Sequence, residues 1–81
     1  MNFPTQAEIE AINPKLDASY PFENRRISMK LKEGKTMTAH ISLSKTGKRF
    51  KCFKRYVNET KTDWIHETTY VKNWQAWVKN L

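Results

Sequence analysis

Alternating hydrophobic and polar positions in the middle of the chain predict antiparallel β-strands. Every second residue of the segment 26–32 is hydrophobic, and the same alternation covers 36–44. A period of two is that of a strand with one buried and one exposed face. Gly34 lies between the two segments and suits a tight turn, because glycine adopts a positive φ without strain. The pattern therefore predicts a β-hairpin.

A third strand is predicted over 49–57, after a turn around Gly47. The segment is rich in aromatic and β-branched residues, which strands favour. Its alternation is irregular, because Phe50 shares one face with Lys54 whereas Phe53 falls on the other face among basic residues. A β-bulge near Phe53 would restore the alternation. Without a bulge, Phe53 stands among the charges, and the sequence leaves both alternatives open.

Two helices are predicted, one before these strands in the chain and one after them. Thr5 and Glu8 have the spacing of a capping box, and the helix that follows ends at Asn13, because the residue before a proline avoids the α region. A second, amphipathic helix is predicted to begin after Thr68 or Thr69 as N-cap. Its hydrophobic residues recur at the helical period: Tyr70, Val71, Trp74, Trp77, Val78 and Leu81.

The segments between these elements complete the predicted fold. Residues 15–24 lack a clear period and are predicted to form a loop that brings Tyr20 and Phe22 onto the core, and 64–66 is a candidate fourth strand. The expected fold is of the α+β class in α-β-β-β-α order, with helices on one face of a three- or four-stranded antiparallel sheet. At 81 residues, the chain is expected to be one domain, 1–81.

Positive charge is concentrated in the predicted strands. The net charge is +7, but residues 25–55 contain eleven basic residues and one acidic residue, a balance of +10, while the flanks contribute −3. Such a concentration attracts phosphate groups through long-range fields and counterion release. A solvated face that only confers solubility would show the same pattern. The charge distribution therefore favours, without requiring, a negatively charged partner.

The open face of the predicted sheet is the candidate binding surface. The segment 48–56 interleaves five cations with three aromatic rings, which is typical of surfaces where cations follow a phosphate backbone and rings stack on bases. An edge strand whose charges discourage aggregation would look similar. The predicted nucleic-acid-binding residues are Arg26, Lys30, Lys32, His40, Lys48, Arg49, Lys51, Phe53, Lys54 and Arg55.

Other chemistry finds little support in the sequence. One cysteine, Cys52, and two histidines lack zinc-ligand spacing, and the chain offers neither a Ser-His-Asp set nor paired carboxylates, so we expect no metal, no cofactor and no catalytic residues. No apolar run is long enough to span a bilayer, so no membrane partner is expected. A single cysteine indicates a reducing, cytoplasmic location.

Three functional hypotheses follow. The first is a non-enzymatic nucleic-acid-binding accessory domain, for DNA or RNA, that uses the basic sheet face. The second is a small inhibitor or adaptor that docks on an acidic or nucleic-acid-handling protein, of the type that phages and mobile elements use, such as anti-CRISPRs. The third is a small metal-free ribonuclease toxin in which His40, Lys51 and Arg55 would surround the scissile phosphate.

Overall fold

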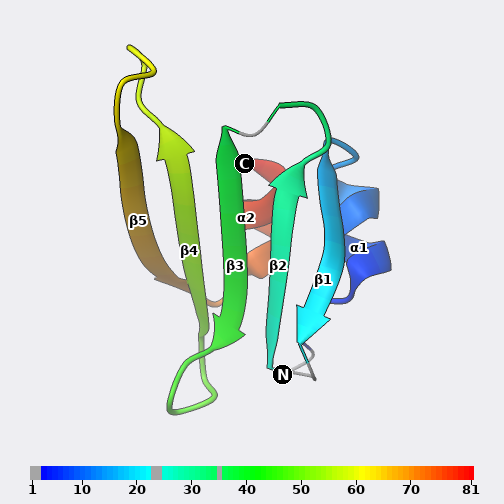
Figure 1. Ribbon diagram of the computed structural model, residues 1–81. Coiled ribbons are helices and arrows are strands. Elements are labelled where there is room, and N and C mark those ends of the chain that lie inside the picture. The colour runs from blue at the N-terminus through cyan, green and yellow to red at the C-terminus, as the bar shows by residue number, and fades with distance from the viewer. Residues whose placement is uncertain (1–2, 23–24, 35) are drawn as a thin grey trace.

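A computed structural model describes residues 3–22, 25–34 and 36–81. Within these residues, five antiparallel strands form one sheet in the order of the chain. Both helices lie behind the sheet, on the side of β1, β2 and β3 (Figure 1), so the α+β class is confirmed with five strands in place of three or four. The elements are α1 (Gln6–Ile12), β1 (Leu16–Phe22), β2 (Arg26–Leu31), β3 (Met37–Leu43), β4 (Phe50–Val57), β5 (Trp64–Val71) and α2 (Trp74–Lys79).

The first helix begins and ends as predicted. The Thr5 hydroxyl accepts a hydrogen bond from the Glu8 backbone N–H at 3.2 Å, and the Glu8 carboxylate accepts one from the Thr5 N–H at 3.3 Å. This capping box satisfies two free N–H groups of the first turn. Asn13 caps the other end, and its buried side-chain amide donates to the Val78 carbonyl of α2 at 2.9 Å. The two helices are thereby joined directly.

Strand β1 replaces the loop predicted after α1. Leu16 and Ala18 are fully buried, and they supply the apolar anchor that a strand needs. The pairing of β1 with β2 shifts register between Asp17 and Tyr20. This irregularity interrupts the period of two, which explains why the sequence shows no clean alternation. The side chains of Tyr20 and Phe22, which we expected on the core, lie outside what the structure describes.

The central hairpin of β2 and β3 follows the alternation of the sequence. Ile27 pairs with Ile41, and Met29 pairs with Ala39. All four side chains are almost fully buried beneath the helices. Gly34, in the connection between the strands, has a φ of +81°, as the turn prediction requires. The covered face of the sheet is therefore assigned correctly from sequence in this region.

Strand β4 is regular, which decides between the two alternatives for Phe53. Its pairing with β3 runs without a register shift from Met37 opposite Tyr56 to Leu43 opposite Phe50. No bulge restores the alternation, so Phe53 lies on the open face among charged residues. Regular pairing with β3 and β5 fixes the register of β4, and with it the face on which Phe53 lies.

The C-terminal part of the chain differs from the prediction. The helix expected from Thr68 or Thr69 begins only at Trp74, with Asn73 as its N-cap, because Trp64–Val71 pairs with β4 as strand β5. Tyr70, expected on the buried helical stripe, is 53% exposed. The threonines and aromatic residues of this segment favour a strand, and the hydrogen bonds to β4 outweigh the helical spacing.

The hydrophobic core lies between the helices and the part of the sheet that they cover. Trp74 and Val78 are buried there, as predicted, and Trp77 packs against the cluster. The outer hairpin, defined here as residues 54–67 of β4, β5 and their turn, extends beyond the helices (Figure 1). Its side facing the helices is held by polar contacts, since Lys54 forms an ion pair with Glu67 at 3.5 Å.

Candidate nucleic-acid interface

The sheet face that the helices leave uncovered, here called the open face, is organised in rows of paired residues. Residues directly opposite each other in an antiparallel pair point to the same side of the sheet. The register therefore places side chains from four strands beside one another in each row. The central row is Ser28, His40, Phe53 and Thr68; the flanking rows are Arg26, Ser42, Lys51 and Tyr70, and Lys30, Thr38, Arg55 and His66.

Three rings form a cluster at the centre of this face. The centroid of the Phe53 ring lies 5.7 Å from that of His40 and 5.7 Å from that of His66. The Ser28 hydroxyl is hydrogen-bonded to His40 Nδ1 at 2.8 Å, which fixes the orientation of the imidazole. Burial, together with the positive charge of Arg26, lowers the pKa of His40. A neutral imidazole beside a partly buried phenyl ring is thus favoured.

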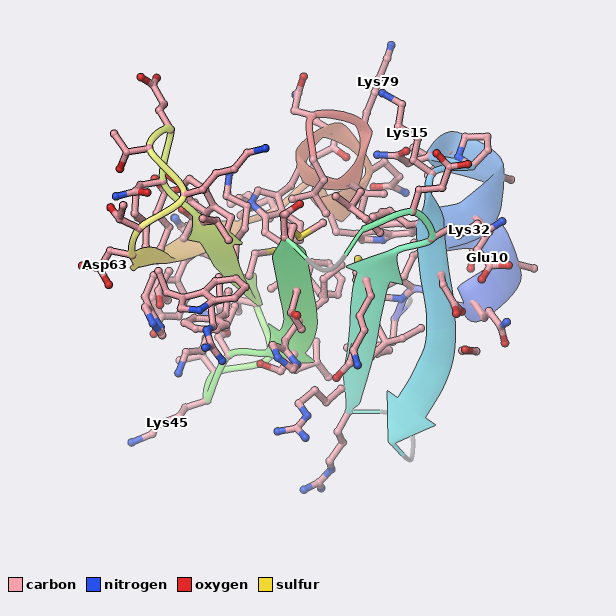
Figure 2. All side chains as sticks on the ribbon, turned by 45° about the horizontal axis from the view of Figure 1, so that its top comes forward. Glu10, Lys15, Lys32, Lys45, Asp63 and Lys79 are labelled. Atoms are coloured by element: carbon pink, nitrogen blue, oxygen red, sulfur yellow. The ribbon has the colours of Figure 1, made fainter. Side chains whose placement is uncertain are left out.

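A depression opens beside this cluster. It has a volume of about 440 Å³ and is broadly open to solvent. A second depression of about 470 Å³ shares Ser42 and Lys51 with it and continues to Tyr70 and Lys45. Figure 2 shows Lys45 projecting from the end of the molecule at the turn between β3 and β4. The first hollow, the Phe53 depression, is lined by Arg26, His40, Ser42, Lys51, Phe53 and Thr68.

Arg55 and Trp64 form a separate contact on the same face. The guanidinium carbon of Arg55 lies 4.3 Å from the centroid of the Trp64 ring, in the range of a cation–π interaction. Trp64 is 38% exposed. The pair belongs to the outer hairpin and lies outside the Phe53 depression.

Four of the predicted binding residues lie away from the rows of the open face. Lys32 directly follows β2, and its N–H donates to the carbonyl of Lys15 at 2.9 Å, beside the start of β1. Lys48 is exposed in the turn before β4, and Arg49 directly precedes that strand. Lys54 points to the opposite face, where it is paired with an acidic residue of β5. The remaining six predicted residues are brought together.

The candidate strand 64–66 is confirmed as the beginning of β5, but sequence reasoning missed the rest of this strand and its contribution to the open face. His66, Thr68 and Tyr70 each complete one of the three rows, and Trp64 lies at the next alternate position of the strand, opposite Val57. A signal was present, because the segment is rich in β-branched and aromatic residues, which strands favour. The helical spacing of Tyr70 with the later tryptophans concealed it. Ser28 was also missed, since only the register reveals that it contacts His40.

The described residues offer little for metal binding or for nucleophilic chemistry. Across residues 3–22, 25–34 and 36–81, no group of three or more His, Cys, Asp or Glu side chains could hold a metal ion. Cys52 is fully buried, and burial raises the pKa of its thiol to about 12, so it is not a reactive thiolate at neutral pH. Of the residues considered for a ribonuclease, His40 and Lys51 share the Phe53 depression, whereas Arg55 lies over Trp64.

Comparisons with known proteins do not extend these observations. Searches against protein-family models, curated proteins and solved structures found no significant match. In the described part of the chain, no helix is both long and apolar enough to cross a membrane.

Proposed function

We propose that the protein is a non-enzymatic nucleic-acid-binding domain that uses the open face of its sheet. The observation that carries this proposal is the charge of that face. Among the described strand positions of the open face, Arg26, Lys30, Lys51 and Arg55 are basic, and Asp17 on β1 is the one acidic residue. The cations lie on β2 and β4, which β3 separates. They are therefore about 10 Å apart across the sheet and can contact phosphates along one backbone.

The polar residues between these cations support the same proposal. Thr38 and Ser42 lie between the cations of β2 and β4, one in each flanking row. Hydroxyl groups commonly donate hydrogen bonds to phosphate oxygens and so position a nucleic-acid backbone. Glu67, the acidic partner of Lys54, lies on the opposite face of the sheet and does not reduce the positive charge of this surface.

Salt dependence of binding tests the proposal. If four to six cations neutralise phosphates, the logarithm of affinity for a labelled oligonucleotide should fall against the logarithm of salt concentration with a slope of roughly −3 to −5. Charge reversal of Lys51 and Arg55 to Glu should weaken binding to every sequence alike and flatten the slope by about 2. Fluorescence anisotropy between about 50 and 200 mM salt measures both effects.

A matched control variant distinguishes binding at the open face from nonspecific attraction by the net charge of the protein. Reversal of Lys15 and Lys79 to Glu changes the total charge by the same amount but on the helix side, where both lysines are exposed (Figure 2). This variant should retain most of the affinity. Equal losses for both double variants would reduce the interaction to nonspecific attraction, and no binding of wild-type protein at the lowest salt would overturn the proposal.

A free sheet edge favours a second candidate, the inhibitor or adaptor. The Asn58 N–H donates to the Asp63 carbonyl at 2.9 Å, and the alternation of antiparallel pairing then directs the backbone groups of His66, Thr68 and Tyr70 away from β4. Among the described residues, these groups have no partner. An extended segment of another protein could add a sixth strand at this edge.

The edge can be tested without disturbing the rest of the sheet. Thr68→Pro removes an outward-facing N–H and leaves the bonds to β4 intact, while Thr68→Ala keeps the N–H. Selective loss of a copurifying protein in Thr68→Pro, together with absent binding of nucleic acid, would favour the second candidate over the first.

A further inference from the structure

Phe53 is placed where a structural role does not require it. Its ring lies on the open face, opposite the side on which the helices cover the core, and it remains only partly buried. Its cross-strand neighbours on that face are His40 and Thr68. A large apolar ring among cations leaves hydrophobic area in contact with water. This arrangement suits a surface whose apolar area becomes covered when a flat ligand binds.

The groups around Phe53 match the chemistry of a nucleobase. The ring supplies a stacking surface, and the hydroxyls of Ser42 and Thr68 line the same depression. His40 Nδ1 is occupied by Ser28, whereas its Nε2 has no hydrogen-bond partner in the described part of the chain. Donors and acceptors beside an aromatic surface can contact the edge of a base while its face stacks.

The charges bordering the depression fit the backbone that would carry such a base. Arg26 and Lys51 both line the Phe53 depression, and Lys51 also lines the neighbouring one that leads to Lys45. A nucleic-acid strand that enters from the side of Lys45 would have these cations beside its phosphates and the Phe53 ring beside one of its bases. Combining a positively charged groove with aromatic stacking is the usual design of surfaces that bind single strands.

A duplex would not use these features. In a double helix, the faces of the bases are stacked on one another and only their edges are exposed in the grooves. The Phe53 ring could then gain no stacking. Resting on the proposed function, we propose that the ligand is single-stranded nucleic acid, with one unpaired base stacked on Phe53 and its flanking phosphates held by Arg26 and Lys51.

The experiment compares three labelled DNA probes of the same length. They are a thymidine strand of about twelve nucleotides, an abasic strand with the same number of phosphates, and a duplex. The abasic strand keeps the charge and removes the base, so it separates stacking from phosphate contact. Each probe is titrated with wild-type protein, Phe53→Ala and the ring-retaining variant Phe53→Tyr. Thermal melts check that all three proteins are folded.

Stacking predicts a specific pattern of affinities. Wild-type protein should bind the thymidine strand more tightly than either other probe. Phe53→Ala should lose roughly 5- to 150-fold on the thymidine strand, which corresponds to the usual contribution of one stacked base, and change little on the abasic strand. Phe53→Tyr should retain most of the affinity, because it keeps the ring.

The outcomes distinguish this inference from the proposed function. If Phe53→Ala weakens the thymidine and abasic strands equally, or if the duplex binds at least as tightly as the thymidine strand, the stacking site is wrong and phosphate binding by the open face stands. If none of the three probes binds even at low salt, both proposals fall.

Discussion

The helix-covered part of the sheet and the outer hairpin differ in what holds them together. Beneath the helices, the side chains of Ile27, Ile41 and Phe50 have at most 1% of their surface exposed. On the outer hairpin, the corresponding side of the sheet has no helix over it, and Ile65 is 36% exposed. The comparison teaches that one continuous sheet is stabilised by hydrophobic burial at one end and mainly by backbone pairing and polar contacts at the other.

The same substitution made in both regions should give very different results. Ile41→Ala removes a fully buried side chain and should lower the free energy of unfolding by about 2–5 kcal/mol, because the cavity can collapse only partly. Ile65→Ala should cost less than about 1 kcal/mol, because its side chain already contacts water. Urea unfolding with both variants measures the difference.

That pair of variants can also break the comparison. Similar losses at the two positions would mean that the outer hairpin is covered in solution, for instance by a second molecule on its exposed side. A smaller loss for Ile41→Ala than for Ile65→Ala would reverse the assignment of the covered region.

The pH dependence of stability sharpens the comparison on the open side of the sheet. His40 lies on the central strand β3 and is partly buried, and its pKa is lowered from 6.5 by burial and by Arg26. The unfolded chain therefore binds more protons here than the folded chain. The contribution of His40 to the stability of the fold is complete at pH values above the pKa of the unfolded chain, about 6.5. This contribution is lost as the pH falls through 6.5 toward the lower pKa of the folded chain.

The matching measurement compares the wild type with His40→Gln. The melting temperature of the wild type should fall more steeply than that of the variant between about pH 7.5 and 5.5. Parallel curves for the two proteins would show that folding does not lower the pKa of His40. The side chain would then be as exposed to solvent in the folded state as in the unfolded chain.

How far the fold could be predicted from sequence depended on how local its signals are. The β2–β3 hairpin was predictable, because strict alternation and Gly34 specify it without reference to other segments. Strand β1 was missed because the register shift after Asp17 interrupts its period. The predicted start of the C-terminal helix was too early, because Tyr70 and Trp74 have helical spacing although Tyr70 belongs to β5 and only Trp74 to α2.

The candidate site was predictable only in part for the same reason. Residue parity along β2, β3 and β4 was enough to group Arg26, His40 and Lys51 on one face. Assigning Phe53 to the open face required the register of β4 with both of its neighbouring strands. The contribution of Thr68 required knowing that its segment is a strand. Pairing between distant segments is set by the whole sheet, and no local pattern records it.

The hydrogen bond from Asn13 to Val78 has a consequence for the order in which the molecule assembles. Each strand pairs with its neighbour in sequence, so the sheet can form by closing short loops one after another. The Asn13 contact joins residues 65 positions apart, and closing so long a loop costs more chain entropy than closing a hairpin. We therefore expect the helices to dock last and to detach first in native fluctuations. Amide hydrogen exchange should accordingly be faster in α1 and α2 than in β3.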